Sequence, residues 1–293
     1  MPTTNSTPGW GCEALMTGPF TVACVQTTSG REIAKNIDAA GALVTGAAKA
    51  GADFVLLPET VNLMENKGKL RAEKITKGDG DGGLSAFQEM ASGAGIWLLA
   101  GSLVVRGEDA ESEKPRAVNR SFLIDPDGAV QASYDKIHMF DVDLGNGEVH
   151  RESKAYAPGD KAVTATLPWG RLGMTVCYDL RFPQLYRALA KDGGADFLSV
   201  PSAFTRPTGE AHWHVLLRAR AIENGCYVFA PAQCGDHENG RKTYGHSLII
   251  NPWGDILADG GEEPGFITAE IDPAEVSKAR TTLPSLTHDR AFT

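Results

Sequence analysis

The two halves of this chain repeat one order of segments, and this repeat limits the folds that the chain can adopt. GADFVLLPE begins at Gly51 and GADFLSVPS begins at Gly194, and each follows a helical pattern. Later, SFLIDPDGAV from Ser121 and SLIINPWGDI from Ser247 both have the pattern of a strand, a turn and a second strand. We therefore predict one fold with an approximate internal two-fold. Segments this short also recur by chance in α/β proteins. The strand order in the structure therefore has to show whether the internal two-fold is real.

Strand-like and helix-like stretches alternate through most of the chain. FTVACVQ, FVLLPE and IWLLAGSLVV have the apolar character of buried strands, and residues 32–50 and 84–94 have apolar side chains at helical spacing. This alternation predicts an α/β architecture. The longest stretch without a clear pattern is 139–162, which we expect to be an irregular, functional loop.

Composition excludes several classes of protein. The 293 residues are 42% hydrophobic, enough for a large core, and the net charge of -9 argues against nucleic acid or an anionic membrane as partner. No apolar segment is long enough to span a bilayer. We expect residues 1–19, where Met16 is an alternative start, to form a flexible leader without a secretory signal. We expect residues 20–293 to form a single domain.

The cysteines indicate a reducing compartment. Their number is five, and no two have CxxC spacing, which argues against a disulfide framework or a structural zinc site and favours the cytoplasm. Cys24 and Cys226 lie in apolar, strand-like runs, which is typical of core cysteines, and Cys234 follows a strand without a sharp bend.

Cys177 stands at a different kind of position. The apolar run LGMTV leads into it, YDLRFP follows, and a helical pattern begins near Pro183. A strand-to-helix bend exposes a nucleophile, and the backbone N–H of Tyr178 is then placed to stabilise an oxyanion. A free cysteine is more often a buried core residue, so this position alone does not establish a nucleophile.

A thiol nucleophile also needs a base, because the thiolate is the attacking form. Glu59 follows FVLLP at the carboxyl end of a predicted buried strand, although an isolated glutamate is more often a cap or turn residue. No histidine lies in a recognisable protease signature. His212 and His214 are two residues apart, so on a helix they point in different directions and are not expected to bind one metal ion.

Eight segments together resemble the nitrilase superfamily of carbon–nitrogen hydrolases, and within it the amidase branch that includes deaminated-glutathione amidase and ω-amidase. They extend over nearly the whole chain, from about residue 22 to about residue 288. Each is weakly specific alone, whereas their order and spacing are highly specific. The segments are LLPET, YDKIHMFDVD, RES, GMTVCYDLRFP, PSAF, AHWHVLLRARAIENGCYV, PAQCG and YGHSLIINPWG.

The resemblance implies a four-layer α-β-β-α sandwich and a role for each matched residue. Cys177 corresponds to the nucleophile, Glu59 to the general base, Lys136 to the lysine that stabilises the oxyanion, and Glu152 to a second, positioning glutamate. Without the resemblance, Lys136 and Glu152 would be interpreted as solvated surface charges. The implied reaction is hydrolysis of a non-peptide amide through a cysteine thioester, with release of ammonia and without a metal or cofactor.

The residues after the nucleophile indicate the branch. Tyr178-Asp179 stands where nitrilases usually carry Trp-Glu, which favours an amidase, and PSAF and PAQCG favour deaminated glutathione or a similar α-keto acid amide as substrate. A structural salt bridge is an equally weighted alternative role for Arg181. The residues expected to bind the substrate or the oxyanion are Tyr178, Arg181, Ala203, Phe204 and Thr205, with Arg206 beside them.

Two positions depart from the family pattern. His214 and Gln184 each stand where glutamate is usual, and we expect them to alter the pocket lining and hence the substrate. The alternative activities are an ω-amidase acting on α-ketoglutaramate, an N-carbamoyl amidohydrolase, acyl transfer to another amine, a non-catalytic binding protein and a thiol redox protein.

The resemblance also implies pairing of subunits through two helices, here the one after Pro183 and the one over about 211–224. The second helix carries apolar residues for both a core and a partner, at Trp213, Leu216, Leu217, Ala221 and Ile222. The C-terminal TTLPSLTHDRAFT resembles an extended tail that lies across a partner. We expect a homodimer or a higher homo-oligomer.

Overall fold

The computed structural model describes residues 18–76, 83–107, 116–145 and 149–290. The expected leader, with Met16 and Cys12, therefore lies almost wholly outside the described residues. No helix within the described ranges is long and apolar enough to cross a lipid bilayer.

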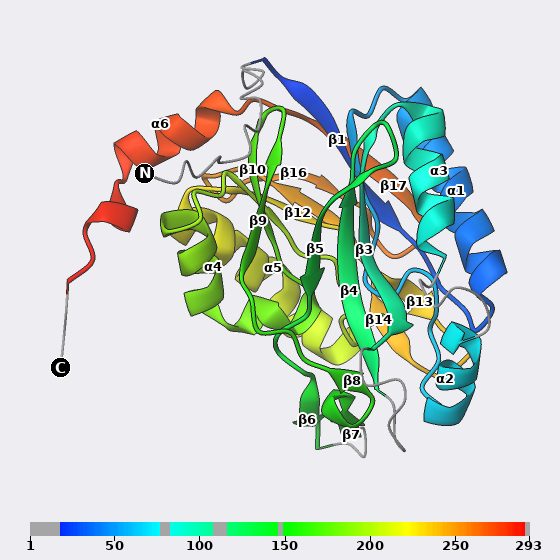
Figure 1. Cartoon of the computed structure of the whole chain (residues 1–293). Helices are drawn as coiled ribbons and strands as arrows, with labels where there is room; N and C mark the ends of the chain where they lie inside the picture. Colours follow the sequence, from blue (N-terminus) through cyan, green and yellow to red (C-terminus); the bar gives the residue numbers. More distant parts are fainter. Residues whose placement is uncertain (1–17, 77–82, 108–115, 146–148, 291–293) are drawn as a thin grey trace, which may run out of the picture.

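Two large sheets form the centre of the molecule (Figure 1). The first follows the order β17-β1-β2-β3-β4-β5, with β8 paired to β4. Its strands are β17 (Gly265–Ile271), β1 (Phe20–Gln26), β2 (Phe54–Leu56), β3 (Trp97–Arg106), β4 (Ala117–Ile124), β5 (Val130–Asp135) and β8 (Tyr156–Ala157).

The second sheet follows the order β16-β15-β12-β11-β10-β9. Its strands are β16 (Ile256–Asp259), β15 (Leu248–Ile250), β12 (Tyr227–Ala230), β11 (Phe197–Ser199), β10 (Gly170–Met174) and β9 (Val163–Leu167).

The two sheets repeat one strand order, which confirms the predicted internal two-fold. In the first sheet β1, β2 and β3 are parallel, and β4 and β5 continue antiparallel. In the second sheet β10, β11 and β12 are parallel, and β15 and β16 continue antiparallel. The segments that begin at Gly51 and Gly194 lead into β2 and β11, which hold equivalent places in the two sheets.

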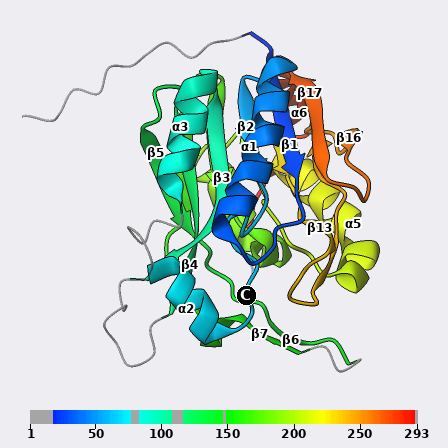
Figure 2. The same cartoon turned by 90° about the vertical axis from the view of Figure 1, so that its right-hand side faces the viewer.

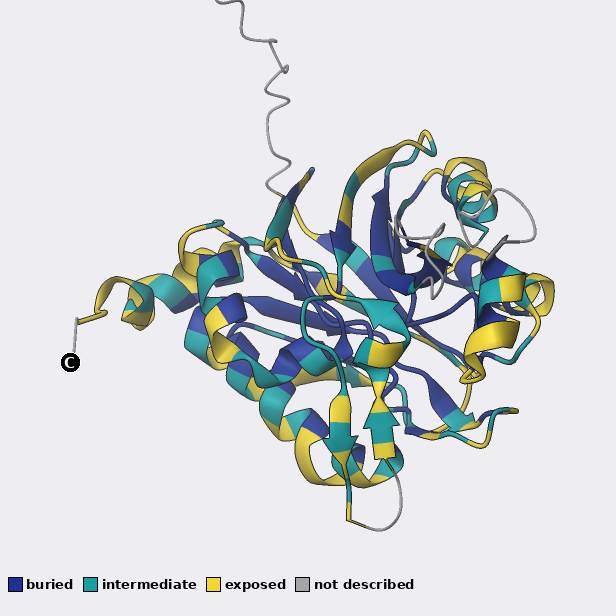
Figure 3. Ribbon diagram, turned by 60° about the horizontal axis from the view of Figure 1, so that its bottom comes forward, coloured by how far each residue is buried: buried dark blue, intermediate teal, exposed yellow. Residues whose placement is uncertain are grey.

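Helices cover the outer faces of both sheets, which gives the expected four-layer α-β-β-α sandwich. Helices α1 (Ile33–Lys49) and α3 (Leu84–Ala94) pack on the first sheet, and α4 (Pro183–Lys191) and α5 (Arg206–Asn224) pack on the second (Figure 1). Aromatic rings join the inner faces, with Phe54 edge-on to Phe229 at 6.4 Å. Dark buried strands therefore lie between helices whose outward faces are exposed (Figure 3).

Most predicted elements lie within a residue or two of their expected bounds, but α5 begins earlier than predicted. It starts at Arg206 instead of near residue 211. Thr205 is still extended, and Pro207 lies in the first turn, where a proline needs no N–H partner. The helix start was therefore predicted about five residues too late.

The stretch 139–162 is not the irregular loop that was predicted. It contains the hairpin strands β6 (Asp141–Asp143) and β7 (Val149–Arg151), a 3-10 helix at Glu152–Lys154, and β8. The hairpin is too short and too exposed to show an alternating hydrophobic pattern. It lies with α2 (Gly68–Thr76) at one end of the molecule (Figure 2).

The C-terminal segment is also not the extended tail that was expected. Helix α6 (Ala274–Thr282) takes up its first residues, and a 3-10 helix follows at Ser285–Thr287. Asp289 then forms ion pairs with Arg187 and with Lys191 of the same chain, the second at 2.6 Å. Charge pairing with α4 therefore holds this segment against its own chain.

Candidate active site

Cys177 occupies a strained bend between β10 and α4. Its φ of 50° lies in the left-handed region, which costs a residue with a side chain on the order of 1–2 kcal/mol. The bend opens the 3-10 helix Cys177–Arg181, and the N–H of Cys177 donates to the carbonyl of Pro201 at 2.9 Å. The predicted elbow is therefore present, and it is tied to the chain that follows β11.

A buried carboxylate stabilises this bend. Asp179 accepts hydrogen bonds from the N–H of Val176 at 2.9 Å, the hydroxyl of Tyr134 at 2.7 Å and the N–H of His138 at 3.0 Å. These donors come from both sheets or from segments that follow them. The Asp179 side chain thus fixes the Cys177 loop to the end of β5, where Lys136 follows.

Glu59 lies at the carboxyl end of β2 and is 4% exposed. Its Oε1 accepts from Nζ of Lys136 and from Nδ2 of Asn119, both at 2.9 Å. Its Oε2 accepts from the N–H of Ala203, also at 2.9 Å. The next residue, Thr60, has a φ of 51°, which is an outlier for a β-branched side chain. A strained backbone and three donors therefore fix one carboxylate.

Lys136 joins this carboxylate to a second one. Its Nζ lies 2.9 Å from each carboxylate oxygen of Glu152 as well as 2.9 Å from Glu59. Glu152 opens the 3-10 helix after β7, and its Oε2 also accepts from the N–H of Phe140 at 2.6 Å. An ammonium group has three N–H donors, and here they face three carboxylate oxygens, one of Glu59 and two of Glu152.

The charges of these groups set the resting protonation of the site. Burial alone would raise the pKa of Glu59, but the charges of Lys136 and Arg241 and the hydrogen bond from Cys177 outweigh it and lower this pKa. Burial would lower the pKa of Lys136, but Glu152 and Glu59 hold it well above its usual value. Burial and the negative charge of Glu59 raise the pKa of the Cys177 thiol. At neutral pH the site therefore holds a carboxylate, an ammonium and a neutral thiol.

These side chains lie at a cavity of about 840 Å³. The structure brings together in its wall every residue that the sequence analysis assigned to the site. The wall includes Glu59, Lys136, Glu152, Cys177, Tyr178, Arg181, Ala203, Phe204, Thr205 and Arg206. The N–H of Ala203 is already bonded to Glu59, so this residue orients the carboxylate and forms part of the wall.

Arg181 is a cation of this wall that forms no salt bridge within the described residues. Its guanidinium lies over the rings of Phe204 at 5.4 Å and Tyr178 at 6.0 Å, and it contacts Nδ1 of His212 at 3.3 Å. No carboxylate in the described part of the chain forms a salt bridge with it. The structural salt bridge considered as an alternative for Arg181 is therefore absent from the described residues.

The two departures from the family pattern do not line the cavity, which corrects the expectation for them. Gln184 is exposed on α4. His214 lies on α5, where it contacts Asp259. Both side chains lie outside the cavity wall, because α4 and most of α5 cover the outer face of the second sheet.

Sequence reasoning missed two residues that shape the site. Asn119 is buried in β4 and donates to Glu59, but Arg120 and Ser121 follow it in the same strand, so its polar side chain does not stand out in the sequence. Arg241 donates to the carbonyl of Ala203, and its charge helps to lower the pKa of Glu59. It precedes β14 (Lys242–Tyr244), and no local pattern distinguishes it from a surface arginine.

One group of three close metal-ligating side chains occurs in the described residues, and it consists of His214, His246 and Asp259. None of the three lines the cavity. The cavity itself offers a thiol, an ammonium and carboxylates, which is a set suited to acyl transfer.

Residues 21–281 match the sequence model of the carbon-nitrogen hydrolases. The chain belongs to the carbon–nitrogen hydrolase family. A relative from Synechocystis sp., described as deaminated glutathione amidase, is 42% identical over 274 residues, covering 92% of this chain and 98% of the relative.

Solved structures show the same relationship. The NitFhit protein of Caenorhabditis elegans has a TM-score of 0.86 at 36% identity, and the match covers 94% of this chain and 66% of that longer protein. Nit3 of Saccharomyces cerevisiae, a member of the nitrilase superfamily, has a TM-score of 0.81 at 28% identity, covering 96% and 100% of the two chains. The carbon–nitrogen hydrolase fold and reaction class expected from the sequence are therefore confirmed, and the chain is an amide-hydrolysing enzyme.

Proposed function

We propose that this enzyme hydrolyses deaminated glutathione or a similar α-keto acid amide through a thioester on Cys177. The observation that carries the proposal is the joint placement of Cys177, Glu59, Lys136 and Glu152 at one cavity. The description of the Synechocystis relative supports the choice of substrate.

The first half-reaction forms the thioester. Because Cys177 is a neutral thiol beside an ionised Glu59, its proton passes to Glu59 as sulfur attacks the amide carbonyl. The positive charge of the Lys136 ammonium stabilises the oxyanion that forms. The C–N bond then breaks, Glu59 returns the proton to the leaving nitrogen, and the amine departs.

The second half-reaction hydrolyses the thioester. Glu59 takes a proton from water, the hydroxide oxygen bonds to the acyl carbon, and the C–S bond breaks. The proton held by Glu59 returns to the sulfur, which restores the thiol and leaves a carboxylic acid product. Glu152 holds Lys136 in place throughout, since it contacts the ammonium with both oxygens.

The identity of the amine depends on the substrate. In deaminated glutathione the amide nitrogen belongs to a cysteine, so the released amine is cysteinylglycine. Ammonia is released from a primary amide such as α-ketoglutaramate. The expected release of ammonia therefore applies to α-ketoglutaramate alone. Both substrates give α-ketoglutarate as the acid product.

The experiment measures α-ketoglutarate formed from deaminated glutathione and from α-ketoglutaramate, side by side. Cys177→Ala should lose on the order of 10³-fold or more of the activity. The matched control is Cys234→Ala, since Cys234 (β13, Cys234–Asp236) is a buried cysteine outside the cavity. A higher kcat/KM for deaminated glutathione supports the proposal, and a higher value for α-ketoglutaramate assigns an ω-amidase.

Two further outcomes address the remaining alternatives. Cysteine-dependent turnover of an N-carbamoyl compound, without turnover of either keto acid amide, would make the enzyme an N-carbamoyl amidohydrolase. Binding of the amides without any turnover would contradict the proposed chemistry and favour a binding protein.

We also propose that the enzyme is a homodimer that pairs through α5. This helix leaves Val215 69% and Ile222 51% exposed, while Trp213, Leu217 and Ala221 are buried. Light scattering after gel filtration should give twice the monomer mass, and Val215→Asp together with Ile222→Asp should shift it toward the monomer. A monomeric mass for the wild-type chain would contradict this proposal.

A cytoplasmic location forms part of the proposal as well. The four cysteines in the described residues are all free thiols, and Cys177 must stay reduced to act as a nucleophile. Fractionation of the source cells should place the activity with the cytosolic proteins.

A further inference from the structure

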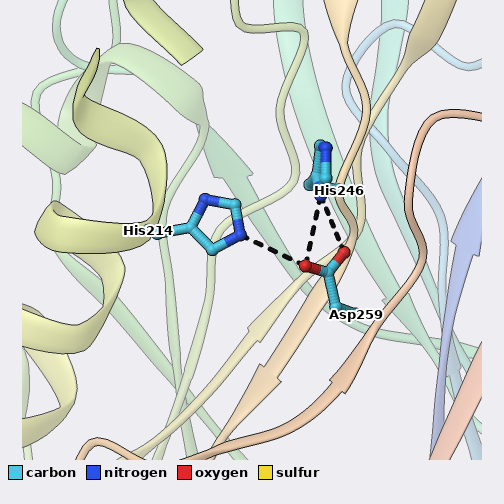
Figure 4. Close-up of side chains that lie close together, drawn as sticks. All are labelled: His214, His246 and Asp259. Atoms are coloured by element: carbon cyan, nitrogen blue, oxygen red, sulfur yellow. Dashed lines mark hydrogen bonds and ion pairs between the residues drawn. The ribbon is translucent and has the colours of Figure 1, made fainter. Parts of the chain in front are cut away.

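A second cluster of reactive side chains lies on the outer side of the second sheet. It consists of His214 on α5, His246 between β14 and β15, and Asp259 at the end of β16 (Figure 4). Asp259 contacts Nε2 of His214 at 3.2 Å and Nδ1 of His246 at 2.9 Å. One potential ligand atom from each residue lies within 4.8 Å of the other two.

The surrounding chain fixes the cluster in advance. His246 has a φ of 53°, an uncommon conformation for a histidine, and both of its backbone groups are bonded. Its N–H donates to the carbonyl of Gly261 at 2.6 Å, and its carbonyl accepts from Nε1 of Trp213 at 2.7 Å. Strained residues of this kind persist where the surrounding structure holds them and are frequent at functional sites.

The charge around the cluster is negative and suits a cation. No lysine or arginine in the described residues pairs with Asp259. Its carboxylate accepts from the N–H of Gly261 at 2.9 Å and otherwise contacts the two imidazoles. The ring of Tyr244 stacks on that of His246, with the ring centroids 4.5 Å apart. The negative charges of Asp259, Glu210 and Glu262 act on Tyr244.

We propose that His214, His246 and Asp259 bind a divalent transition-metal ion of the Zn²⁺ type. Two imidazoles and one carboxylate form a ligand set that zinc accepts, with a fourth position left for water. Ligands about 2.0–2.2 Å from zinc lie about 3.3–3.5 Å apart in a tetrahedron, so modest side-chain rotations suffice here. A neutral imidazole can carry its hydrogen on the other ring nitrogen, which frees the ligand nitrogen. Mg²⁺ and Ca²⁺ prefer sets made of oxygen alone, so this ligand set favours a transition metal over them.

The ion would join three elements that are far apart in the sequence. Two of them reach the candidate active site, because Arg206, Thr208 and Glu210 of α5 and Lys242 of β14 line the cavity. Bound zinc would therefore hold the first turns of α5 against the segment that joins β14 to β15. The site is independent of the proposed substrate, since none of its three ligands lines the cavity.

The experiment titrates Zn²⁺ into the chelator-treated full chain and measures heat and thermal unfolding. We expect one ion per chain, a rise in Tm with Zn²⁺ and no rise with Mg²⁺. His214→Ala should weaken the binding at least tenfold. His246→Asn should do the same, and it keeps a residue that tolerates the left-handed conformation. His212→Ala is the matched control, because it removes an imidazole from the same helix outside the cluster.

Cobalt distinguishes this site from the Cys177 thiol. Co²⁺ bound by imidazole and carboxylate gives weak visible bands, whereas Co²⁺ bound by a thiolate adds an intense near-ultraviolet band. Weak bands that His214→Ala removes would support the proposal. The proposal is overturned if the wild-type chain does not bind Zn²⁺ at about 100 µM, if binding survives His214→Ala, or if the thiolate band accompanies it.

Discussion

At the scale of single residues, the site keeps the proton on the Cys177 thiol and holds an ionised acceptor, Glu59, beside it. The Cys177 thiol is held neutral by burial and by the charge of Glu59, while Glu59 is held ionised by Lys136 and Arg241. The site therefore does not depend on a preformed thiolate. Its activity depends on whether Glu59 is free to accept a proton.

This arrangement predicts the pH dependence of kcat/KM. As the pH falls, activity is lost when Glu59 becomes protonated, and because its pKa is lowered, that loss lies below the ordinary value of 4.5. Because the pKa of Cys177 is raised, no gain in activity is expected near pH 8.5, where ordinary thiols ionise. Initial rates from about pH 4 to about pH 10 would test both the loss of activity in acid and the absence of a gain near pH 8.5.

Tryptophan fluorescence over the same range is the control for unfolding at acidic pH. An activity rise with a midpoint near the ordinary thiol pKa would contradict the assigned protonation states, because it would mean that the thiolate forms before substrate binds.

Arg181 is predicted to bind an acidic group of the substrate. Arg181→Met keeps a long apolar stem over the rings of Tyr178 and Phe204 but removes the charge. A hydrogen bond to a charged group contributes about 2 kcal/mol, so KM for a keto acid amide should rise about 30-fold with a smaller change in kcat.

A neutral primary amide is the control substrate for Arg181→Met, and its KM should change little. An equal loss on the charged and the neutral amide would show that Arg181 supports the fold of the wall instead of recognising charge.

The reacting residues could be predicted from the sequence, whereas the residues that orient them could not. Glu59, Lys136, Glu152 and Cys177 stand in motifs, so they could be found without coordinates. Asn119 and Arg241 act on Glu59 and Ala203 from far along the chain, which leaves no local pattern. The His214 cluster was missed for the same reason: its partners are His246 and Asp259, far along the chain, and His212 beside it is not involved.

At the scale of elements, α5 packs closely against β14. Gly209 lies in the first turns of α5, where an added Cβ would overlap the side chain of Tyr244. This position has an ordinary helical φ, so the glycine is needed for space and not for conformation. The close approach brings the first turns of α5 to the cavity wall.

Gly209→Ala should therefore destabilise the protein by about 1–3 kcal/mol, as overpacked cores do. The matched control is Gly93→Ala in α3, where an added Cβ meets nothing within 4 Å. That change should be neutral or stabilise by about 0.4–1 kcal/mol, because it reduces the freedom of the unfolded chain. Urea denaturation of both variants measures the difference, and equal effects would contradict the packing argument.

Strands and helices with a buried face were predicted from sequence, whereas exposed elements were not. The first and third helices carry apolar stripes, and both were placed within a residue of their bounds. The hairpin of β6 and β7 is largely exposed, so its sequence carries no periodic signal. The C-terminal segment depends on ion pairs of Asp289 with α4, and such contacts cannot be inferred from local composition.

At the scale of the whole molecule, we propose that residues 20–293 form one folding unit. The main core combines side chains of both sheets, with Phe20 stacked on Trp169 at 4.2 Å and edge-on to Phe197 at 5.5 Å. Neither half can bury its inner face without the other. The internal two-fold therefore describes the strand order and not two independent domains.

Unfolding should accordingly be a single transition. Tryptophans report on both halves, with Trp97 in β3 and Trp213 in α5, while far-ultraviolet circular dichroism reports on all helices and strands. The midpoints from the two signals should coincide in urea at fixed protein concentration. Separate midpoints would contradict the single unit and indicate that one half unfolds first.

The Cys177 bend is tied by hydrogen bonds to Pro201 and Tyr134, and its base and ammonium come from the other half of the chain. During synthesis the ribosome delivers Glu59 and Lys136 first, then Cys177, and last the segments that complete the second sheet. The thiol therefore meets its proton acceptor only in a nearly finished polypeptide. An incomplete translation product carries the same residues but no assembled reactive centre, so a truncated chain left in the cell would be inert toward its substrate.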